Sequence, residues 1–189
     1  MTTIRDLLVI ARAEFADSDT PALDAQVLLG AVLNVDRAYL LAHGEDELST
    51  EQEAKFRQMI ARRSAGEPIA YILGTRGFYD LELIVTPDVL TPRPQTEFLL
   101  ETSLKLTNHL QNITVADIGT GSGALAITFA RHHPSATVYA VDVSPSALDV
   151  ARKNAEYNQA EVCFLAGNLA QPLMERGIKL DLLMANLPY

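Results

Sequence analysis

The sequence lacks the features of proteins that are stabilised by disulfides, span a membrane or bind nucleic acid through a broad basic surface. It contains one cysteine, so no internal disulfide can form, which fits a reducing compartment. No apolar run approaches the roughly 18 residues of a membrane span, and no basic segment followed by an apolar core opens the chain. Lys and Arg number 15 against 24 Asp and Glu, a net charge of -9, which argues against broad binding to a phosphate backbone. We therefore expect a cytoplasmic protein whose partners include no membrane and no nucleic acid.

Cysteine and histidine are also scarce, and we expect their side chains to have structural roles. Cys163 lies in an apolar run (162–165) and is predicted to be a buried core thiol. The four histidines show no metal-ligand spacing, so we interpret them as surface or capping residues and expect no metal site. Arg62 and Arg63 allow two interpretations, a solvated face or a docking surface for a protein partner.

Residues 1–68 carry apolar side chains at helical spacing and predict a small helical domain. Thr3 and Asp6 form a candidate capping box for its first helix. The start of the fourth helix fits either of two such boxes, opened by Ser49 or by Thr50. The helices are expected over residues 3–16, from the Thr20-Pro21 pair to about residue 33, over 37–42 and from about 50 to 66.

Residues 69–90 change to aromatic and β-branched side chains around Tyr79-Asp80, a pattern that predicts a β-hairpin linker. The following segment, residues 91–97, places a proline on each side of Arg93 and leads into a helix that ends near Leu106. Prolines fix φ and remove backbone donors, so the segment is stiff and extended. Its residues fit a rigid lid over a pocket and an ordinary helix start equally well.

Residues 91–189 alternate strand and helix patterns, which predicts a parallel sheet with right-handed crossovers. The fold class is α/β, and this part is the first half of a doubly wound, Rossmann-like domain. Strands are expected over 113–118, 136–141, 161–166 and 180–185, with helices over 124–132 and from 144 onward. The first strand runs directly into the glycine-rich turn at 119–123, where a ligand can approach the backbone closely.

Asp142 stands at the end of the second strand, about 20 residues beyond the glycine turn. At this position a carboxylate can accept hydrogen bonds from the two ribose hydroxyls of a nucleoside cofactor. The loop also satisfies the loose dinucleotide pattern with alanine last, so it does not separate a nicotinamide cofactor from S-adenosylmethionine.

Asn186, Leu187, Pro188 and Tyr189 follow the fourth strand and favour methyl transfer. In a doubly wound sheet this strand lies beside the first, so both open onto one crevice. The Asn186 side-chain oxygen and the next backbone carbonyl offer two acceptors for a planar NH2 group, on which an aromatic ring can stack. Holding a nitrogen in line with an electrophilic methyl supplies much of the catalysis without a metal or a covalent nucleophile.

The chain resembles the HemK (PrmC) family of protein glutamine methyltransferases along its whole length. The passages that carry the resemblance are residues 66–71 (GEPIAY), 74–79 (GTRGFY), 90–97 (LTPRPQTE), 117–123 (DIGTGSG) and 186–189 (NLPY). The first three are far more specific than the glycine loop, which related methyltransferases share. The resemblance implies transfer of a methyl group from S-adenosylmethionine to the glutamine N5 in the Gly-Gly-Gln motif of class 1 peptide-chain release factors, in translation termination.

The resemblance also implies a role for individual residues. The methionine end of the cofactor would be held by Gly119, Thr120, Gly121, Ser122 and Gly123. Asp142 would hold the ribose, Asn168 and Leu169 would lie near the adenine, and Asn186 would also face the cofactor. The substrate glutamine would be bound by Asn186 with Leu187, Pro188 and Tyr189, and the helical domain would recognise the release factor. The catalytic residues would be Asn186, Pro188 and Tyr189.

Several departures from the family pattern keep two alternatives open. Leu187 stands where the family usually has proline, and Asn-Leu-Pro-Tyr also occurs in rRNA adenine dimethyltransferases, so adenine N6 methylation is the enzymatic alternative. Asn168 and Gln95 replace usual acidic residues. A sheet of this type usually continues for several more strands, so we expect a truncated chain that transfers methyl groups poorly by itself. A non-catalytic module that binds release factors is the other alternative.

Overall fold

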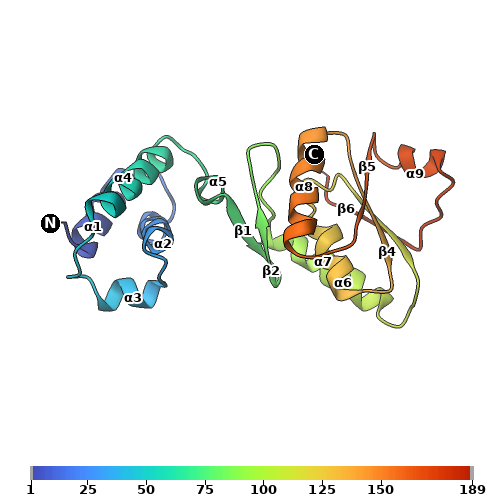
Figure 1. The fold of residues 1–189 in the computed structure, drawn as a ribbon, viewed down its shortest axis with the longest axis horizontal. Coiled ribbons are helices and arrows are strands. Elements are labelled where there is room, and N and C mark those ends of the chain that lie inside the picture. Colours follow the sequence, from blue (N-terminus) through green and yellow to red (C-terminus); the bar gives the residue numbers. More distant parts are fainter. Residues whose placement is uncertain (1, 188–189) are drawn as a thin grey trace. The chain divides into compact units, whose positions relative to one another are not determined.

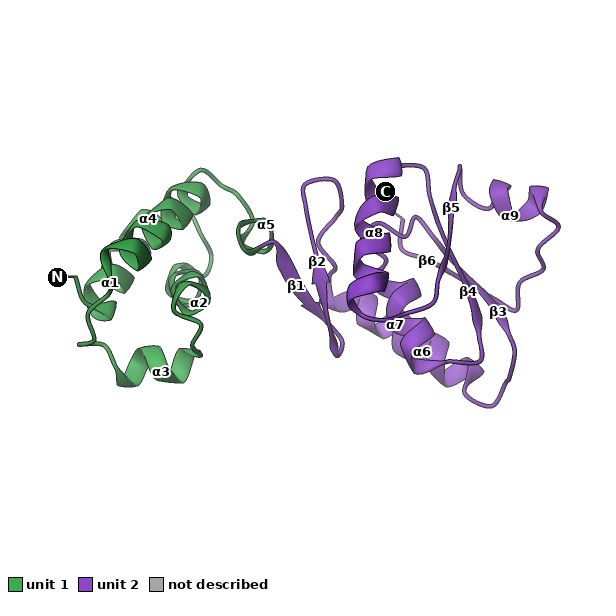
Figure 2. Cartoon of the chain, viewed as in Figure 1, with its two compact units in different colours: residues 1–73 green, residues 74–189 purple. Residues whose placement is uncertain are grey.

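The structure of the protein is a computed structural model that describes residues 2–187. It divides into two compact units, residues 1–73 and 74–189, which Figure 2 distinguishes by colour. Each unit has its own apolar core. No helix in the described range is both long and apolar enough to cross a membrane.

The first unit is helical, as the apolar spacing predicted. Its elements are α1 (Ile4–Glu14), α2 (Pro21–Leu33), α3 (Arg37–Ala42), α4 (Thr50–Ser64) and α5 (Ile69–Leu73). The predicted capping box at the start of α1 is present, because the Thr3 side chain accepts a hydrogen bond from the Asp6 backbone N–H at 3.2 Å. At the start of α4, Ser49 and Gln52 form the box, which decides between the two predicted possibilities.

Arg62 and Arg63 hold the first unit together, so neither of the two sequence interpretations is sufficient. The Arg63 Nε donates to Asp24 Oδ2 at 2.9 Å, and the Asp24 side chain is only 9% exposed. Arg62 donates to both carboxylate oxygens of Glu67, at 2.7 and 2.5 Å. Asp24 also accepts from the hydroxyl of Thr20, which therefore makes no side-chain cap to the α2 backbone. These ion pairs join segments that local sequence patterns treat separately.

The second unit contains a parallel four-stranded sheet that begins after a β-hairpin and a helix. Its elements are β1 (Thr75–Phe78), β2 (Leu81–Ile84), α6 (Pro94–Thr107), β3 (Thr114–Ile118), α7 (Ala124–His132), β4 (Thr137–Asp142), α8 (Pro145–Tyr157), β5 (Cys163–Ala166), α9 (Gln171–Glu175) and β6 (Leu182–Ala185). The strand order is β5-β4-β3-β6. The strands of residues 113–118 and 180–185 are therefore neighbours, as the doubly wound topology predicted.

Alternate residues of the strands build two apolar layers on the two faces of this sheet. Val115 of β3 packs in one cluster with residues of α6 and α7, such as Leu100 and Phe129. Ile118 of the same strand packs in the other cluster, with Leu173 of α9. Figure 1 shows α6, α7 and α8 on one side of the sheet and α9 on the other. Because Asp117 has the same parity as Val115, its side chain points toward the α6 and α7 side.

Residues 69–90, for which the sequence predicted a linker, contribute to both units. Residues 69–73 form α5 in the first unit, whereas β1 and β2 belong to the second. β1 and β2 pair in antiparallel register, with Phe78 opposite Leu81 and Tyr79-Asp80 at the turn. The hairpin is tied to α8 through Asn154, which contacts the Ile84 backbone. Among the described residues it is therefore part of a folded unit.

The prediction of a buried cysteine was wrong, whereas one histidine that was expected to cap a helix does so from a buried position. Cys163 is exposed, because β5 is an edge strand of the sheet in the described chain and its first residue is not covered. His133, assigned with the other histidines to a surface or capping role, is the C-cap of α7, where its backbone N–H donates to the Phe129 carbonyl oxygen at 2.8 Å, and it is only 8% exposed. Its ring stacks on Phe129 at 5.5 Å between centroids, and its Nε2 lies 3.2 Å from the Thr107 carbonyl oxygen.

Candidate methyl-transfer site

The glycine-rich loop between β3 and α7 is fixed to the end of the neighbouring strand. The backbone N–H groups of Gly119 and Thr120 both donate to the carbonyl oxygen of Val141, at 2.8 and 3.0 Å. The next free N–H, that of Gly121, donates to Asp142 Oδ2 at 2.9 Å. The loop is therefore held in a defined conformation at the carboxyl edge of the sheet.

The three glycines of the loop serve different steric purposes. A side chain at Gly119 would collide with Leu187, and one at Gly123 would meet Ile127 Cδ1 at 2.6 Å. Gly121 has a φ of +54° and nothing within 4 Å of the place where a Cβ would stand. Gly119 and Gly123 are thus required by packing within the protein, whereas Gly121 borders the open space that a ligand can fill.

Asp142 combines a structural contact with spare hydrogen-bonding capacity. Its Oδ2 accepts from the Gly121 N–H and its Oδ1 accepts from the Ser144 N–H, both at 2.9 Å. A carboxylate offers about four acceptor positions, so each oxygen retains one. The side chain is half-buried. It can therefore orient the loop and still accept hydrogen bonds from a diol.

Asp117 is the buried acid of the site. Its carboxylate is 2% exposed and accepts a hydrogen bond from the Thr120 hydroxyl at 2.6 Å. Burial raises the pKa of Asp117 to about 6, against the lowering effect of the hydrogen bond from Thr120. The nearby Asp142 raises this pKa further. The cavity lining thus includes a buried carboxyl group whose pKa is raised well above that of an exposed aspartate.

Asn186 reaches the site from the end of β6. Ile118 pairs with Ala185 in the β3–β6 ladder, so Asn186 follows directly beside Gly119. The Asn186 Nδ2 donates to the Thr96 hydroxyl oxygen at 2.8 Å, across 90 positions of the sequence. Thr96 belongs to the first turn of α6 and is only 8% exposed. The ends of β3 and β6 therefore meet in one place, with α6 beside them.

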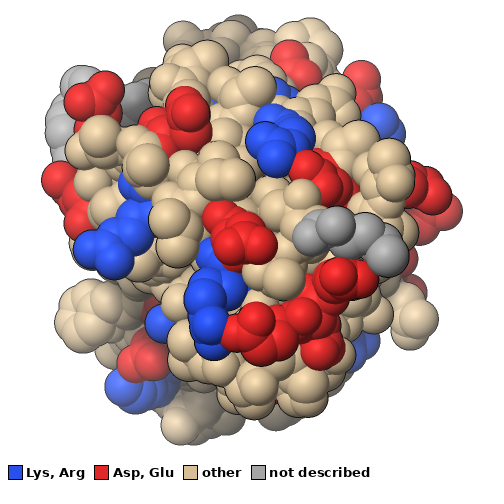
Figure 3. Space-filling model, turned by 90° about the vertical axis from the view of Figure 1, so that its left-hand side faces the viewer, with Lys and Arg blue, Asp and Glu red and all other residues tan. Residues whose placement is uncertain are grey.

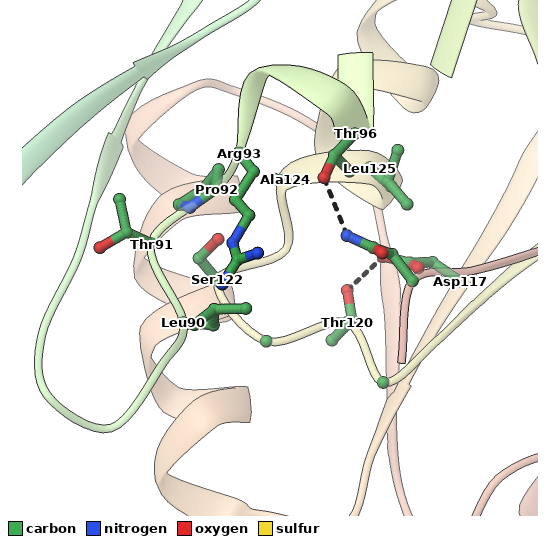
Figure 4. Close-up of a pocket in the computed structure, with 13 residues that line it drawn as sticks. Leu90, Thr91, Pro92, Arg93, Thr96, Asp117, Thr120, Ser122, Ala124 and Leu125 are labelled. Carbon is green, nitrogen blue, oxygen red and sulfur yellow. Dashed lines mark hydrogen bonds between the residues drawn. The ribbon is translucent and has the colours of Figure 1, made fainter. Parts of the chain in front are cut away.

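Most of these groups line one cavity, shown in Figure 4, whereas Asp142 lies outside its lining and contacts it through the Gly121 N–H. Its wall is formed by residues 90–93 and Thr96 before and within α6, by Asp117 and residues 119–122, by Ala124 and Leu125 of α7, and by Asn186. Arg93 is the only basic side chain among the described lining residues. Residues 90–93 thus border the cavity and lead into α6, which begins at Pro94, while a lid function for the segment stays a prediction.

The structure brings some of the predicted site residues together and places others at the margin. Gly119, Thr120, Gly121, Ser122 and Asn186 line the cavity. Gly123 packs against the protein, and Leu187 lies against Gly119. Asn168 and Leu169 are exposed in the turn after β5, where the preceding Gly167 N–H donates to the Asp142 carbonyl oxygen at 3.0 Å. Pro188 and Tyr189 lie outside the described residues.

Two contributors to the site had not been recognised in the sequence as such. Thr96 was seen only as part of the proline-flanked segment, and its bond to Asn186 has no local signal. Asn154 in α8 is fully buried, and its side chain bonds the Ile84 N–H, the Ile84 carbonyl and the Ser122 carbonyl. A signal for Asn154 did exist, because it lies three residues after Ala151 on the buried face of a helix, where an amide needs partners.

Comparison with known proteins identifies both parts of the chain. Residues 6–74 match the family model of the PrmC N-terminal domain, and residues 94–189 match that of the methyltransferase small domain. A release factor glutamine methyltransferase of Bordetella pertussis is 44% identical over 189 residues, covering 100% of this chain and 67% of that protein. The chain belongs to the release factor glutamine methyltransferase family. A family member of Koribacter versatilis is 43% identical, covering 93% of this chain and 62% of that protein.

The chain spans about two thirds of the length of these curated family members. Solved structures agree with the fold of the second unit. A T. thermophilus 16S rRNA methyltransferase, solved with AdoMet and guanosine, aligns with a TM-score of 0.52 at 23% identity, covering 61% of this chain and 32% of that one. A SAM-dependent methyltransferase from Agrobacterium tumefaciens aligns with a TM-score of 0.51 at 16% identity, covering 60% and 39%. At these identities the likeness describes the fold alone.

Proposed function

We propose that this protein transfers a methyl group from S-adenosylmethionine to the side-chain amide nitrogen N5 of glutamine in the Gly-Gly-Gln motif of class 1 release factors. The observation that carries this proposal is the junction of two strand ends. The glycine loop after β3 and Asn186 after β6 line the same cavity. The names of the chain's relatives support a release factor as the substrate. The shared cavity supports binding of a cofactor and an amide next to each other.

The residues at the glycine loop fit S-adenosylmethionine. The open space over Gly121 admits the ligand next to the backbone. The spare acceptor positions of Asp142 suit the ribose hydroxyls, with Asn168 and Leu169 in the adjacent turn for the adenine. Arg93 offers the positive charge that the carboxylate of the methionine moiety requires. The cofactor supplies an electrophilic methyl group attached to a positively charged sulfur.

Asn186 and the backbone after it bind and orient the glutamine side chain. The Asn186 Oδ1 accepts one N–H of the substrate amide, and the Leu187 carbonyl is proposed to accept the other. The amide nitrogen then bonds to the methyl carbon as the carbon–sulfur bond breaks, the sulfur keeps the electron pair, and the nitrogen releases one proton to water. Because an amide nitrogen is a poor nucleophile, acceptors that favour positive charge on it lower the barrier. Pro188 and Tyr189 complete this proposed substrate contact.

Recognition of a protein is favoured over recognition of rRNA. The first unit matches the PrmC N-terminal domain, which we propose binds the release factor. On the face drawn in Figure 3, the acidic and basic side chains of the described residues are interspersed, and the basic ones form no continuous area. A continuous basic area is what sequence-independent binding of a phosphate backbone needs. The class 1 release factor is therefore the proposed partner.

Mass spectrometry of a release factor after incubation with the full-length protein and S-adenosylmethionine tests this function. We expect one added methyl group on the peptide that contains the Gly-Gly-Gln motif, and none when that glutamine is replaced by alanine. Ribosomal RNA is offered in a parallel reaction. Methyl label in the RNA alone would establish the adenine alternative. Binding of the release factor without any transfer would leave only the non-catalytic alternative.

A further inference from the structure

The carboxamide of Asn186 has two ends of nearly equal shape and opposite hydrogen-bonding character. Its oxygen accepts hydrogen bonds and its NH2 group donates them. Only the orientation with the oxygen toward the substrate can accept from the NH2 group of a glutamine. The reverse orientation would set two NH2 groups against each other. The orientation of Asn186 therefore matters, and the group that contacts one end of its carboxamide helps to hold it.

Thr96 is the residue in contact with the nitrogen end. The Asn186 Nδ2 donates to Thr96 Oγ1 at 2.8 Å, a bond drawn as a dashed line ending at Thr96 in Figure 4. This bond leaves the Asn186 oxygen as the end that is available for other groups. Asn186 itself is exposed, whereas Thr96 is only 8% exposed. The buried residue is thus the anchor, and the exposed one is held by it.

The position of Thr96 is itself fixed by the start of α6. Pro94 is the first residue of this helix, and the Thr96 N–H donates to the carbonyl oxygen of Arg93 at 2.9 Å. A threonine in a helix has only two common χ1 rotamers, so its hydroxyl has few positions to occupy. Because α6 packs against both α7 and β6, this helix start has a fixed place beside the end of the sheet.

We infer that Thr96 is a positioning residue for the proposed transfer: it holds the Asn186 carboxamide with its oxygen toward the substrate, so that the site accepts an NH2-bearing side chain. This inference rests on the proposed function. The inference also explains the stiff segment at residues 91–97, because this segment positions the start of α6, which carries Thr96. A glutamate side chain, which at neutral pH has only acceptors, would be rejected by the same arrangement.

Three variants of the full-length protein test the role of Thr96 in turnover. Thr96→Val keeps the shape and removes the acceptor, Thr96→Ser keeps the acceptor, and Thr107→Val is the matched control. Thr107 is a buried threonine on the same helix whose hydroxyl donates to Ser103 within α6. We expect Thr96→Val to lower kcat roughly five- to tenfold, the value of one lost hydrogen bond, with the affinity for S-adenosylmethionine unchanged. Thr96→Ser and Thr107→Val should stay within about twofold of the wild type.

A second measurement follows the carboxamide directly and needs no turnover. NMR of the 15N-labelled protein reports the solvent exchange of the Asn186 side-chain NH2 protons. We expect faster exchange in Thr96→Val and wild-type behaviour in Thr96→Ser. Unchanged exchange and unchanged kcat in Thr96→Val would overturn the inference, as would an equal loss of kcat in Thr96→Ser or Thr107→Val. If the wild type transfers no methyl group to release factors, the proposed function fails, while the exchange experiment still decides whether Thr96 holds Asn186.

Discussion

Replacing Asn154 with leucine should loosen the contact of α8 with both the hairpin and the glycine loop. The Asn154 Nδ2 donates to the carbonyl oxygens of Ile84 and Ser122, each at 2.9 Å, and its Oδ1 accepts from the Ile84 N–H at 2.6 Å. Leucine has the same branched arrangement of side-chain heavy atoms and no polar atoms. The substitution therefore leaves three backbone groups without their partner and creates little empty space.

The burial of these three groups sets the size of the effect. Ser122 is 3% exposed, and leaving its buried carbonyl unpaired costs about 1–3 kcal/mol. The two Ile84 groups are half-buried and regain part of their hydrogen bonding from water, at roughly 0.5–1 kcal/mol each. We therefore expect the Asn154→Leu variant to lose about 2–5 kcal/mol of unfolding free energy. Its affinity for S-adenosylmethionine should also fall, because the Ser122 loop is no longer held.

Urea denaturation followed by circular dichroism measures this loss, with Asn158→Ala as the matched control. Asn158 is the C-cap of α8, one turn after Asn154, and its Nδ2 donates to the Glu82 carbonyl oxygen of the hairpin at 3.0 Å in an exposed setting and to the Asn154 carbonyl oxygen at 2.9 Å. Its removal should cost less than about 1 kcal/mol, because water replaces the partner. Equal stability losses in the two variants, or a loss below about 0.5 kcal/mol in Asn154→Leu, would refute the reasoning.

Three further predictions concern the cavity itself. Because burial raises the folded-state pKa of Asp117 to about 6, the folded protein binds its proton more tightly than the unfolded chain, and this group's contribution to stability, roughly 3 kcal/mol, should be lost as pH rises from about 3 to 7. Urea denaturation across that range should show this loss as the difference between the wild type and Asp117→Asn. Calorimetry should find that Gly121→Ala weakens cofactor binding, while Gly123→Ala, which collides with Ile127, should lower the melting temperature more. Arg93→Gln should weaken S-adenosylhomocysteine binding about tenfold, roughly 1.4 kcal/mol, and leave 5′-methylthioadenosine, which has no carboxylate, unaffected.

Much of the second unit could be predicted because its signals are local or topological. Apolar runs and glycines mark β3 and the loop after it, and the capping and proline patterns mark where α6 and α8 begin. The adjacency of β3 and β6 follows from the strand order of a doubly wound sheet. The meeting of the glycine loop with Asn186 was therefore predictable before any coordinates.

The remaining features depend on packing between segments that lie far apart in the sequence. Cys163 has apolar neighbours, yet it is exposed because its strand is at the edge of the described sheet. The pairing of Arg63 with Asp24 spans 39 positions, and that of Asn186 with Thr96 spans 90. Periodicity reports which face of an element is buried, but not which polar group of another element will meet it. The anchoring of the site was for this reason the least predictable part.

The most direct test of the account is the Asn186→Ala variant of the full-length protein, measured both for methyl transfer to a release factor and for S-adenosylmethionine affinity. The account places the substrate amide at the end of β6, beside a cofactor bound after β3. It therefore predicts that Asn186→Ala loses methyl transfer, while its affinity for S-adenosylmethionine stays within about tenfold, roughly 1.4 kcal/mol, of the wild type. Transfer at the wild-type rate by Asn186→Ala would contradict the account, because the amide would then be held elsewhere.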